Sequence, residues 1–205
     1  MNNRNLIVTL AVVALLTVAA TTAGCATNTT PSPTPIPATQ TTVGNNTTYS
    51  STAGFNITYN KSLKADTSTD AKAPVRIYIY LNPTEIIDGV LVASEGLAPS
   101  KTLNDFANDK VYNLRNYSNA GLYKNFTLNE TNSTFAGKPA RTVVFSGIIP
   151  QQLNQTTTKN VTVKEMQTFV VNNNKGYVVT YKAISSDYDK YLAQAQRIMN
   201  SFVLT

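Results

Sequence analysis

The sequence predicts an α+β domain in which a central antiparallel sheet is flanked by two helices. Short segments of alternating or β-branched residues recur between residues 54 and 184, as expected for strands. Several neighbouring segments are joined by tight turns rich in Gly, Asn and Pro, and strands joined in this way must be antiparallel. Two further segments each have one apolar helical face, which needs a sheet face to cover it.

The first three expected strands cover residues 54–60, 75–81 and 89–94. The first alternates strictly, with Phe55, Ile57 and Tyr59 on one face, and this pattern is typical of a half-buried strand. The second is rich in β-branched and aromatic residues and ends at Asn82-Pro83.

A helix is expected at residues 102–117, because Thr102 and Asp105 have capping-box spacing ahead of a periodic apolar face. Strands follow at residues 125–131, 140–149, 161–171 and 177–184, with turns at 132–133, 137–139 and 172–176 and a polar loop at 150–159. Ser185, Ser186 and Asp187 then form a helix start, and the last helix is expected at residues 187–201.

Four segments resemble the PsbP family, the extrinsic proteins of photosystem II, in the order in which that family has them. They are GFNITY at 54–59, FAGKPA at 135–140, the pair MQTFVV at 166–171 and GYVVTYKA at 176–183, and the helix from Tyr188 to the IMNSF ending at 198–202. The resemblance covers residues 54–204 and implies a PsbP-like α/β/α sandwich, an antiparallel sheet with helices on both faces. It also implies a non-catalytic accessory protein that docks on a membrane complex.

The chain departs from the PsbP pattern in three respects. Asn60 stands where the family usually has proline, and the nearby tryptophan is absent. The chain has no histidine, so a histidine-based manganese or calcium-linked role of the photosynthetic members does not carry over.

The N-terminus predicts export. One cation and an uncharged, largely apolar run at residues 6–20 indicate a signal peptide over residues 1–24. The run ends in small residues followed by Cys25, the only cysteine, which resembles a lipobox even though Thr22 stands where Leu, Val or Ile is preferred. We expect Cys25 to be lipidated, residues 25–52 to be a disordered Thr/Pro/Asn-rich tether, and residues 53–205 to be the domain. The alternative is an ordinary secretory signal with an incidental cysteine.

Eleven Asn-x-Ser/Thr sequons are present, about twice the number expected from composition. They are Asn28, Asn45, Asn46, Asn56, Asn60, Asn116, Asn125, Asn129, Asn132, Asn154 and Asn160. The excess predicts an N-glycosylated surface protein, and together with the lipobox it indicates an archaeal cell surface. The alternative is a compositional bias toward Asn and Thr without glycans.

Composition excludes several kinds of chemistry. Without histidine and with a single cysteine, no Ser-His-Asp or Cys-His site, histidine-ligated metal or intramolecular disulfide can form. Ser146 lacks an elbow motif, and the pairs Asp105 with Asp109 and Asp187 with Asp189 are expected to be caps or solvated surface. Glu85, Asp88 and Glu95 could bind calcium through their oxygens, but they do not have EF-hand-like spacing. We therefore expect no cofactor, no metal and no enzyme activity.

Two binding functions remain open. The first is an accessory lipoprotein at the outer face of the cytoplasmic membrane, with a protein or envelope partner; the net charge of +6 is scattered, so nucleic acid is not expected. The second is a small-ligand or wall-polymer binder with a groove lined by Tyr78, Tyr80, Tyr177 and Tyr181. A large exposed apolar patch would favour the first function, and a concave pocket of about 300 Å³ or more would favour the second.

Overall fold

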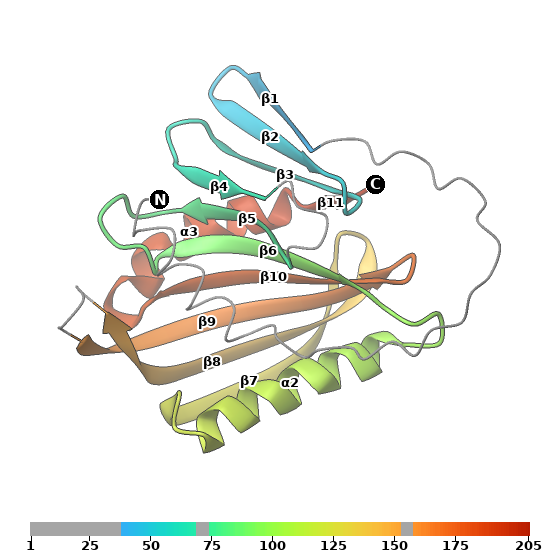
Figure 1. Cartoon of the computed structure of the whole chain (residues 1–205). Coiled ribbons are helices and arrows are strands. Elements are labelled where there is room, and N and C mark those ends of the chain that lie inside the picture. Colours follow the sequence, from blue (N-terminus) through green and yellow to red (C-terminus); the bar gives the residue numbers. More distant parts are fainter. Residues whose placement is uncertain (1–37, 69–73, 153–157) are drawn as a thin grey trace.

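The computed structural model describes residues 38–68, 74–152 and 158–205. This part of the chain forms eleven strands and two helices, with one helix after the sixth strand and the other after the tenth (Figure 1). The strands are β1 (Thr39–Val43), β2 (Asn46–Ser51), β3 (Phe55–Asn60), β4 (Ala65–Thr67), β5 (Val75–Tyr80), β6 (Gly89–Gly96), β7 (Lys124–Phe135), β8 (Lys138–Gln152), β9 (Thr158–Asn172), β10 (Lys175–Ile184) and β11 (Val203–Leu204); the helices are α2 (Leu103–Asn119) and α3 (Ser185–Asn200).

Seven strands form the main sheet, in the order β4-β5-β6-β10-β9-β8-β7, and every pair is antiparallel. Two tight hairpins set the register of its long strands. Ala136 and Gly137 both have positive φ in the β7–β8 turn, and Asn173 and Asn174 do so in the β9–β10 turn, as two-residue hairpins between twisted strands require. The expected hairpin of residues 161–184 is confirmed.

A second sheet corrects the expectation of one central sheet flanked by two helices. It has the order β1-β2-β3-β11, and β1 and β2 lie within residues 25–52, which we expected to be tether. Their threonines and Tyr49 favour strands, and Gly44 in the turn adopts the positive φ that a tight hairpin needs. Tyr49 is almost fully buried against Phe55, so residues 39–51 belong to the folded domain.

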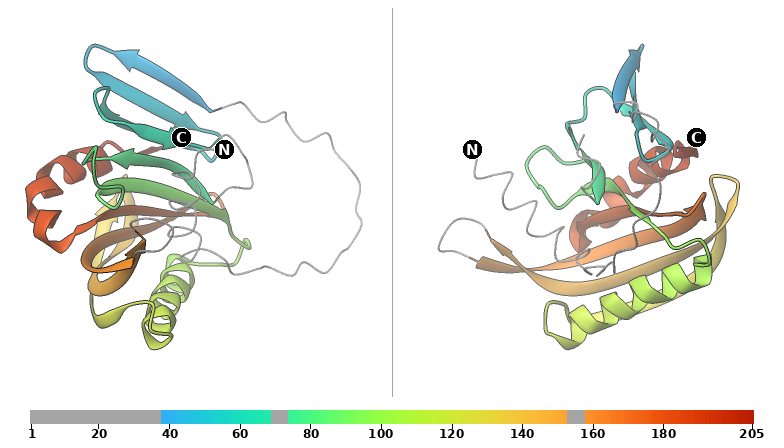
Figure 2. Two further views of the ribbon diagram at one scale, coloured as in Figure 1. Left: turned by 60° about the vertical axis from the view of Figure 1, so that its left-hand side comes forward. Right: turned by 45° about the vertical axis from the view of Figure 1, so that its right-hand side comes forward.

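The main sheet has a separate apolar core on each face. Alternate residues of β9 and β10 enter the two cores: Phe169 and Val178 pack on the side of α2, whereas Val170 and Tyr177 pack on the side of α3 and the small sheet. Figures 1 and 2 show α2 along one face and α3 on the other, with β1, β2 and β3 stacked beyond β4. The expected arrangement of a helix on each face is therefore present, with the small sheet added on one side.

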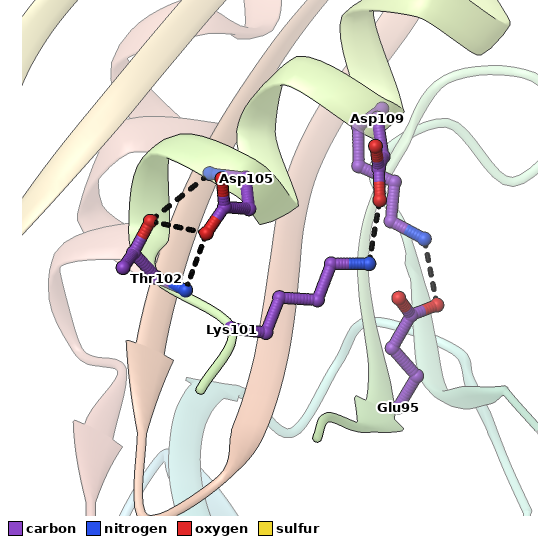
Figure 3. Close-up of polar contacts among 6 residues, drawn as sticks. Glu95, Lys101, Thr102, Asp105 and Asp109 are labelled. Carbon is purple, nitrogen blue, oxygen red and sulfur yellow. Dashed lines mark hydrogen bonds and ion pairs between the residues drawn. The ribbon is translucent and has the colours of Figure 1, made fainter. Parts of the chain in front are cut away.

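Both expected helices are present. Thr102 caps α2 through a complete capping box with Asp105, drawn in Figure 3. Helix α3 begins at Ser185, two residues earlier than expected. Its N-cap residue is Ile184, whose apolar side chain makes no capping hydrogen bond.

Three strand boundaries need correction. The turn expected at residues 132–133 is absent, since β7 runs through it without a break. Strands β8 and β9 extend into the loop expected at 150–159, and residues 153–157 lie outside the described part. Long cross-strand pairing overrides the local turn preference of Asn and Ser at these positions.

Candidate functional site

An open groove of about 360 Å³ lies on the α3 side of the main sheet, where the helix leaves the outer strands uncovered. Strands β7, β8 and β9 form its floor, and the last two turns of α3 form one wall. Nine residues line it: Ser133, Thr134 and Phe135 from β7, Thr142 from β8, Met166 and Thr168 from β9, and Gln196, Met199 and Asn200 from α3.

A chain of three hydroxyl groups crosses the strands at the groove. The oxygen of Ser133 lies 3.0 Å from that of Thr142, which lies 3.1 Å from that of Thr168. The register places Thr142 directly opposite Thr168, so the contact follows from the pairing of β8 with β9. Hydroxyls linked in this way polarise one another and hold fixed orientations.

The apolar part of the groove is anchored in the core. Phe135 stacks on Phe202, with ring centroids 5.4 Å apart, and Met199 is buried at the end of α3. Met166 lies beside them on β9 and is half-buried. Residues more than sixty positions apart in the sequence thus meet here, and no local motif marks them.

The four tyrosines predicted as a binding surface are all buried, so the tyrosine-lined groove is wrong. Tyr177 and Tyr181 are at most 1% exposed; their hydroxyls donate hydrogen bonds to the backbone oxygens of Ala53 (2.8 Å) and Tyr188 (2.6 Å). Both rings are buried because they pack with the apolar residues on the same face of the sheet.

Tyr78 and Tyr80 lie on the opposite face and are at most 5% exposed. The ring of Tyr78 covers Gly89, where a Cβ atom would come within 2.5 Å of it, and its hydroxyl donates to the carbonyls of Ile86 and Ile87. Burial and the neighbouring Tyr80 raise the pKa of Tyr78 well above its usual value. These tyrosines are structural.

A buried ion pair on the α2 side was not predicted. Glu165 on β9 is 1% exposed and accepts from Lys182 on β10, with 2.8 Å between nitrogen and oxygen. The carboxylate also accepts from Tyr123 (3.3 Å) and Gln167 (3.2 Å). Burial and the charge of Glu165 raise the pKa of Tyr123 well above its usual value, so this phenol stays protonated and donates.

The acidic residues weighed as a calcium site do not meet. Asp88 is buried and accepts from the backbone N–H of Ile184 (2.8 Å) and from Asn82 (3.1 Å), which ties the loop before β6 to the start of α3. Glu95 instead pairs with Lys110 at 2.6 Å, and Glu85 lies beside Gln151. Within the described part of the chain, no three Asp, Glu or Cys residues form a group that could hold a metal ion.

The other polar candidates have structural partners. Asp105 is part of the α2 cap, and Asp109 pairs with Lys101, as Figure 3 shows beside the contact of Glu95. The hydroxyl of Ser146 lies 2.8 Å from that of Thr127 within the sheet. Asp187 lies in the first turn of α3, where the helix dipole favours an anion.

Sequons lie on the surface wherever the structure describes them, with one exception. The exposed ones are Asn45, Asn46, Asn60, Asn116, Asn125, Asn129, Asn132 and Asn160. Asn56 is half-buried between β2 and β11. Asn28, Asn154, Cys25 and the expected signal peptide lie outside the described residues. Among the helices that the structure describes, none is long and apolar enough to cross a bilayer.

The fold class follows from comparison with solved structures. No protein-family model matches this sequence, and no curated protein matches it. The solution structure of cyanobacterial PsbP (CyanoP) from Synechocystis sp. PCC 6803 superposes with a TM-score of 0.58 at 15% identity, covering 80% of this chain and 95% of that one. The chain therefore has a PsbP-like fold.

Two more distant likenesses cover similar shares of the chain. One is LpqN from Mycobacterium tuberculosis, described as involved in cell envelope biogenesis, with a TM-score of 0.44, 15% identity, and coverage of 74% of this chain and 83% of that one. The other is PA94 from Pseudomonas aeruginosa, described as a putative regulator, with a TM-score of 0.44, 12% identity, and coverage of 79% and 99%.

Proposed function

We propose that this chain is a lipoprotein of an archaeal cell surface, held at the outer face of the cytoplasmic membrane by a lipid on Cys25. Its PsbP-like domain binds a small ligand or an envelope polymer in the groove between α3 and β7–β9. The segment between Cys25 and strand β1 keeps the domain close to the membrane. Exposed sequons over most of the domain are consistent with an N-glycosylated exterior.

The groove is the observation that carries the proposal. At about 360 Å³ it falls within the range of roughly 300–1,000 Å³ of small-ligand sites. The large apolar side chains that are exposed in the described residues are Val43, Tyr112, Leu122 and Val203, and they belong to four separate segments. Ligand binding in the groove is therefore better supported than docking through one apolar patch.

The chemistry of the groove supports binding rather than catalysis. Its nine lining residues include no carboxylate, amine, guanidinium or thiol, so none of them could act as a general acid or base near neutral pH. The buried carboxylates of Glu165 and Asp88 are not among the residues that line the groove, and both already accept hydrogen bonds from other groups. We propose that the domain has no catalytic activity.

A second candidate is an accessory role with a protein partner, and the free edge of β7 favours it. This strand of 12 residues ends the main sheet, so within the described part of the chain one of its edges has no strand beside it. An extended segment of a membrane complex could add there as a further strand. Site-specific crosslinkers at Leu128 or Thr134 on intact cells would capture such a partner.

Membrane attachment is tested through Cys25. The wild-type chain should partition with membranes and carry the mass of a lipid on an N-terminal Cys25, whereas Cys25→Ser should be released. Cys25→Ser is compared with Ser32→Ala in the tether, which leaves lipidation intact. An unmodified Cys25, or cleavage elsewhere, would refute the tethered function.

A further inference from the structure

We propose that the groove between α3 and the β7–β9 strands binds a neutral saccharide. This inference rests on the proposed binding function and names its ligand class. The bound part would be one or two sugar rings of a larger glycan, because the groove is small and open to solvent.

The polar lining matches a polyol. Four of the nine residues have hydroxyls and two have primary amides: Ser133, Thr134, Thr142, Thr168, Gln196 and Asn200. Hydroxyls and amides can both donate and accept hydrogen bonds, as sugar hydroxyls also do. A ligand that only donates or only accepts would leave half of this capacity unused.

The lining also discriminates against charged ligands. With no ionisable side chain among the nine residues, a carboxylate, phosphate or ammonium would lose hydration without a counter-charge. Lys164, on the same face of β9, is directed over the ring of Tyr188, 4.2 Å from its centroid. A neutral sugar avoids this desolvation cost.

The apolar lining supplies the other half of the match. A pyranose ring presents C–H groups on one side, and these can pack on apolar side chains through apolar burial and dispersion. Phe135 and Met199 are held by the core beneath the groove, and Met166 adds a polarisable, adaptable surface.

The site is ordered before any ligand arrives. Its residues come from three hydrogen-bonded strands and a helix, and the Ser133–Thr142–Thr168 chain fixes the middle hydroxyl, that of Thr142. Ser133 and Thr168 are the ends of this chain, and each retains capacity for a further bond. Binding therefore requires little ordering of the protein.

The test uses the full-length chain from a bacterial host without N-glycosylation, so that no glycan of its own can fill the groove. The protein is kept in a detergent without a sugar head group. It is applied to an array of neutral oligosaccharides of glucose, galactose, mannose and N-acetylglucosamine, together with sulfated and uronic-acid counterparts. The tightest neutral sugar is then titrated while the backbone amide NMR signals of Thr142, Thr168 and Gln196 are followed.

Two variants and one matched control separate groove binding from general effects. Thr142→Val removes the central hydroxyl with little change of shape and should weaken binding about two- to tenfold, the effect of one neutral hydrogen bond. Gln196→Met removes an exposed amide from the wall and should weaken it similarly. Thr127→Val removes a hydroxyl of the same sheet that lies outside the groove, and it should leave affinity unchanged.

Neutral sugars that shift the groove amides and bind these two variants more weakly would support the inference. It is overturned if no neutral sugar shifts those amides, if acidic sugars bind more tightly, or if Thr127→Val weakens binding as much as Thr142→Val. If no neutral sugar binds in the groove but Cys25 is lipidated, only the ligand class is refuted. An unmodified Cys25 refutes the tethered function instead, so the two failures are distinguishable.

Discussion

Removing Lys182 should expose how strongly the buried carboxylate of Glu165 depends on its partner. Lys182→Met keeps most of the volume and the apolar stem of the side chain but removes the ammonium 2.8 Å from the carboxylate. Glu165 is 1% exposed, and the two hydrogen bonds that remain to it come from neutral donors. Stranding a buried charge in this way costs about 3–5 kcal/mol, a large share of the stability of a domain of this size.

Urea unfolding followed by circular dichroism would measure the loss. We expect the free energy of unfolding to fall by about 3–5 kcal/mol, seen as a lower urea midpoint with an unchanged dependence of that free energy on urea concentration. The melting temperature should fall by about 10 °C. The matched control is Lys101→Met, whose partner Asp109 is 59% exposed, and it should cost no more than about 1 kcal/mol.

A double variant tests the electrostatic cause directly. Glu165→Gln combined with Lys182→Met removes both charges and keeps an acceptor for Tyr123, so it should recover at least half of the lost stability. The reasoning would be refuted if Lys182→Met unfolded within about 1 kcal/mol of wild type, or if the double variant were no more stable than the single one.

Two further predictions concern the surface. Thr102→Ala should remove the α2 cap and cost about 1 kcal/mol of unfolding free energy near neutral pH, measured by thermal unfolding. Hydrogen bonds from Thr102 lower the pKa of Asp105 in the folded state, so the part of this contribution that depends on the ionised carboxylate is present above about pH 4 and is lost as the pH falls further, whereas the bond from the Asp105 N–H to the Thr102 hydroxyl remains; an effect at pH 2 as large as that near neutral pH would contradict it. Glycopeptide mass spectrometry of the native protein should find glycans at Asn129 and Asn160, which are exposed, and none at the half-buried Asn56.

The hairpin of β9 and β10 shows how far local reasoning can reach. The hairpin was predicted with a turn at residues 172–176, whereas the strands close on Asn173 and Asn174, and it is this two-residue turn that places Glu165 opposite Lys182. Glu165 also shares a face with Val163 and Phe169, so a charge on an apolar face was readable as an anomaly. The partner of Glu165, however, depends on the exact register of the turn, which the structure supplies.

The small sheet shows where local reasoning fails. Residues 39–51 are rich in Thr and Asn and contain little apolar surface, so composition favoured a tether. The segment is ordered because backbone pairing with β3 and burial of Tyr49 stabilise it. Both the pairing and the burial involve residues outside the segment, so its own composition does not reveal them.

The sequence by itself determined the order of the long strands and helices, the α2 cap and the long hairpins, because these depend on periodicity and turn chemistry over a few residues. Only the tertiary structure decided which side chains are accessible. Tyr177 and Tyr181 alternate in the pattern of a binding surface, yet α3 and the small sheet cover them. The groove exists because α3 stops short of β7 and β8, and the exposure of a side chain depends on what covers its face.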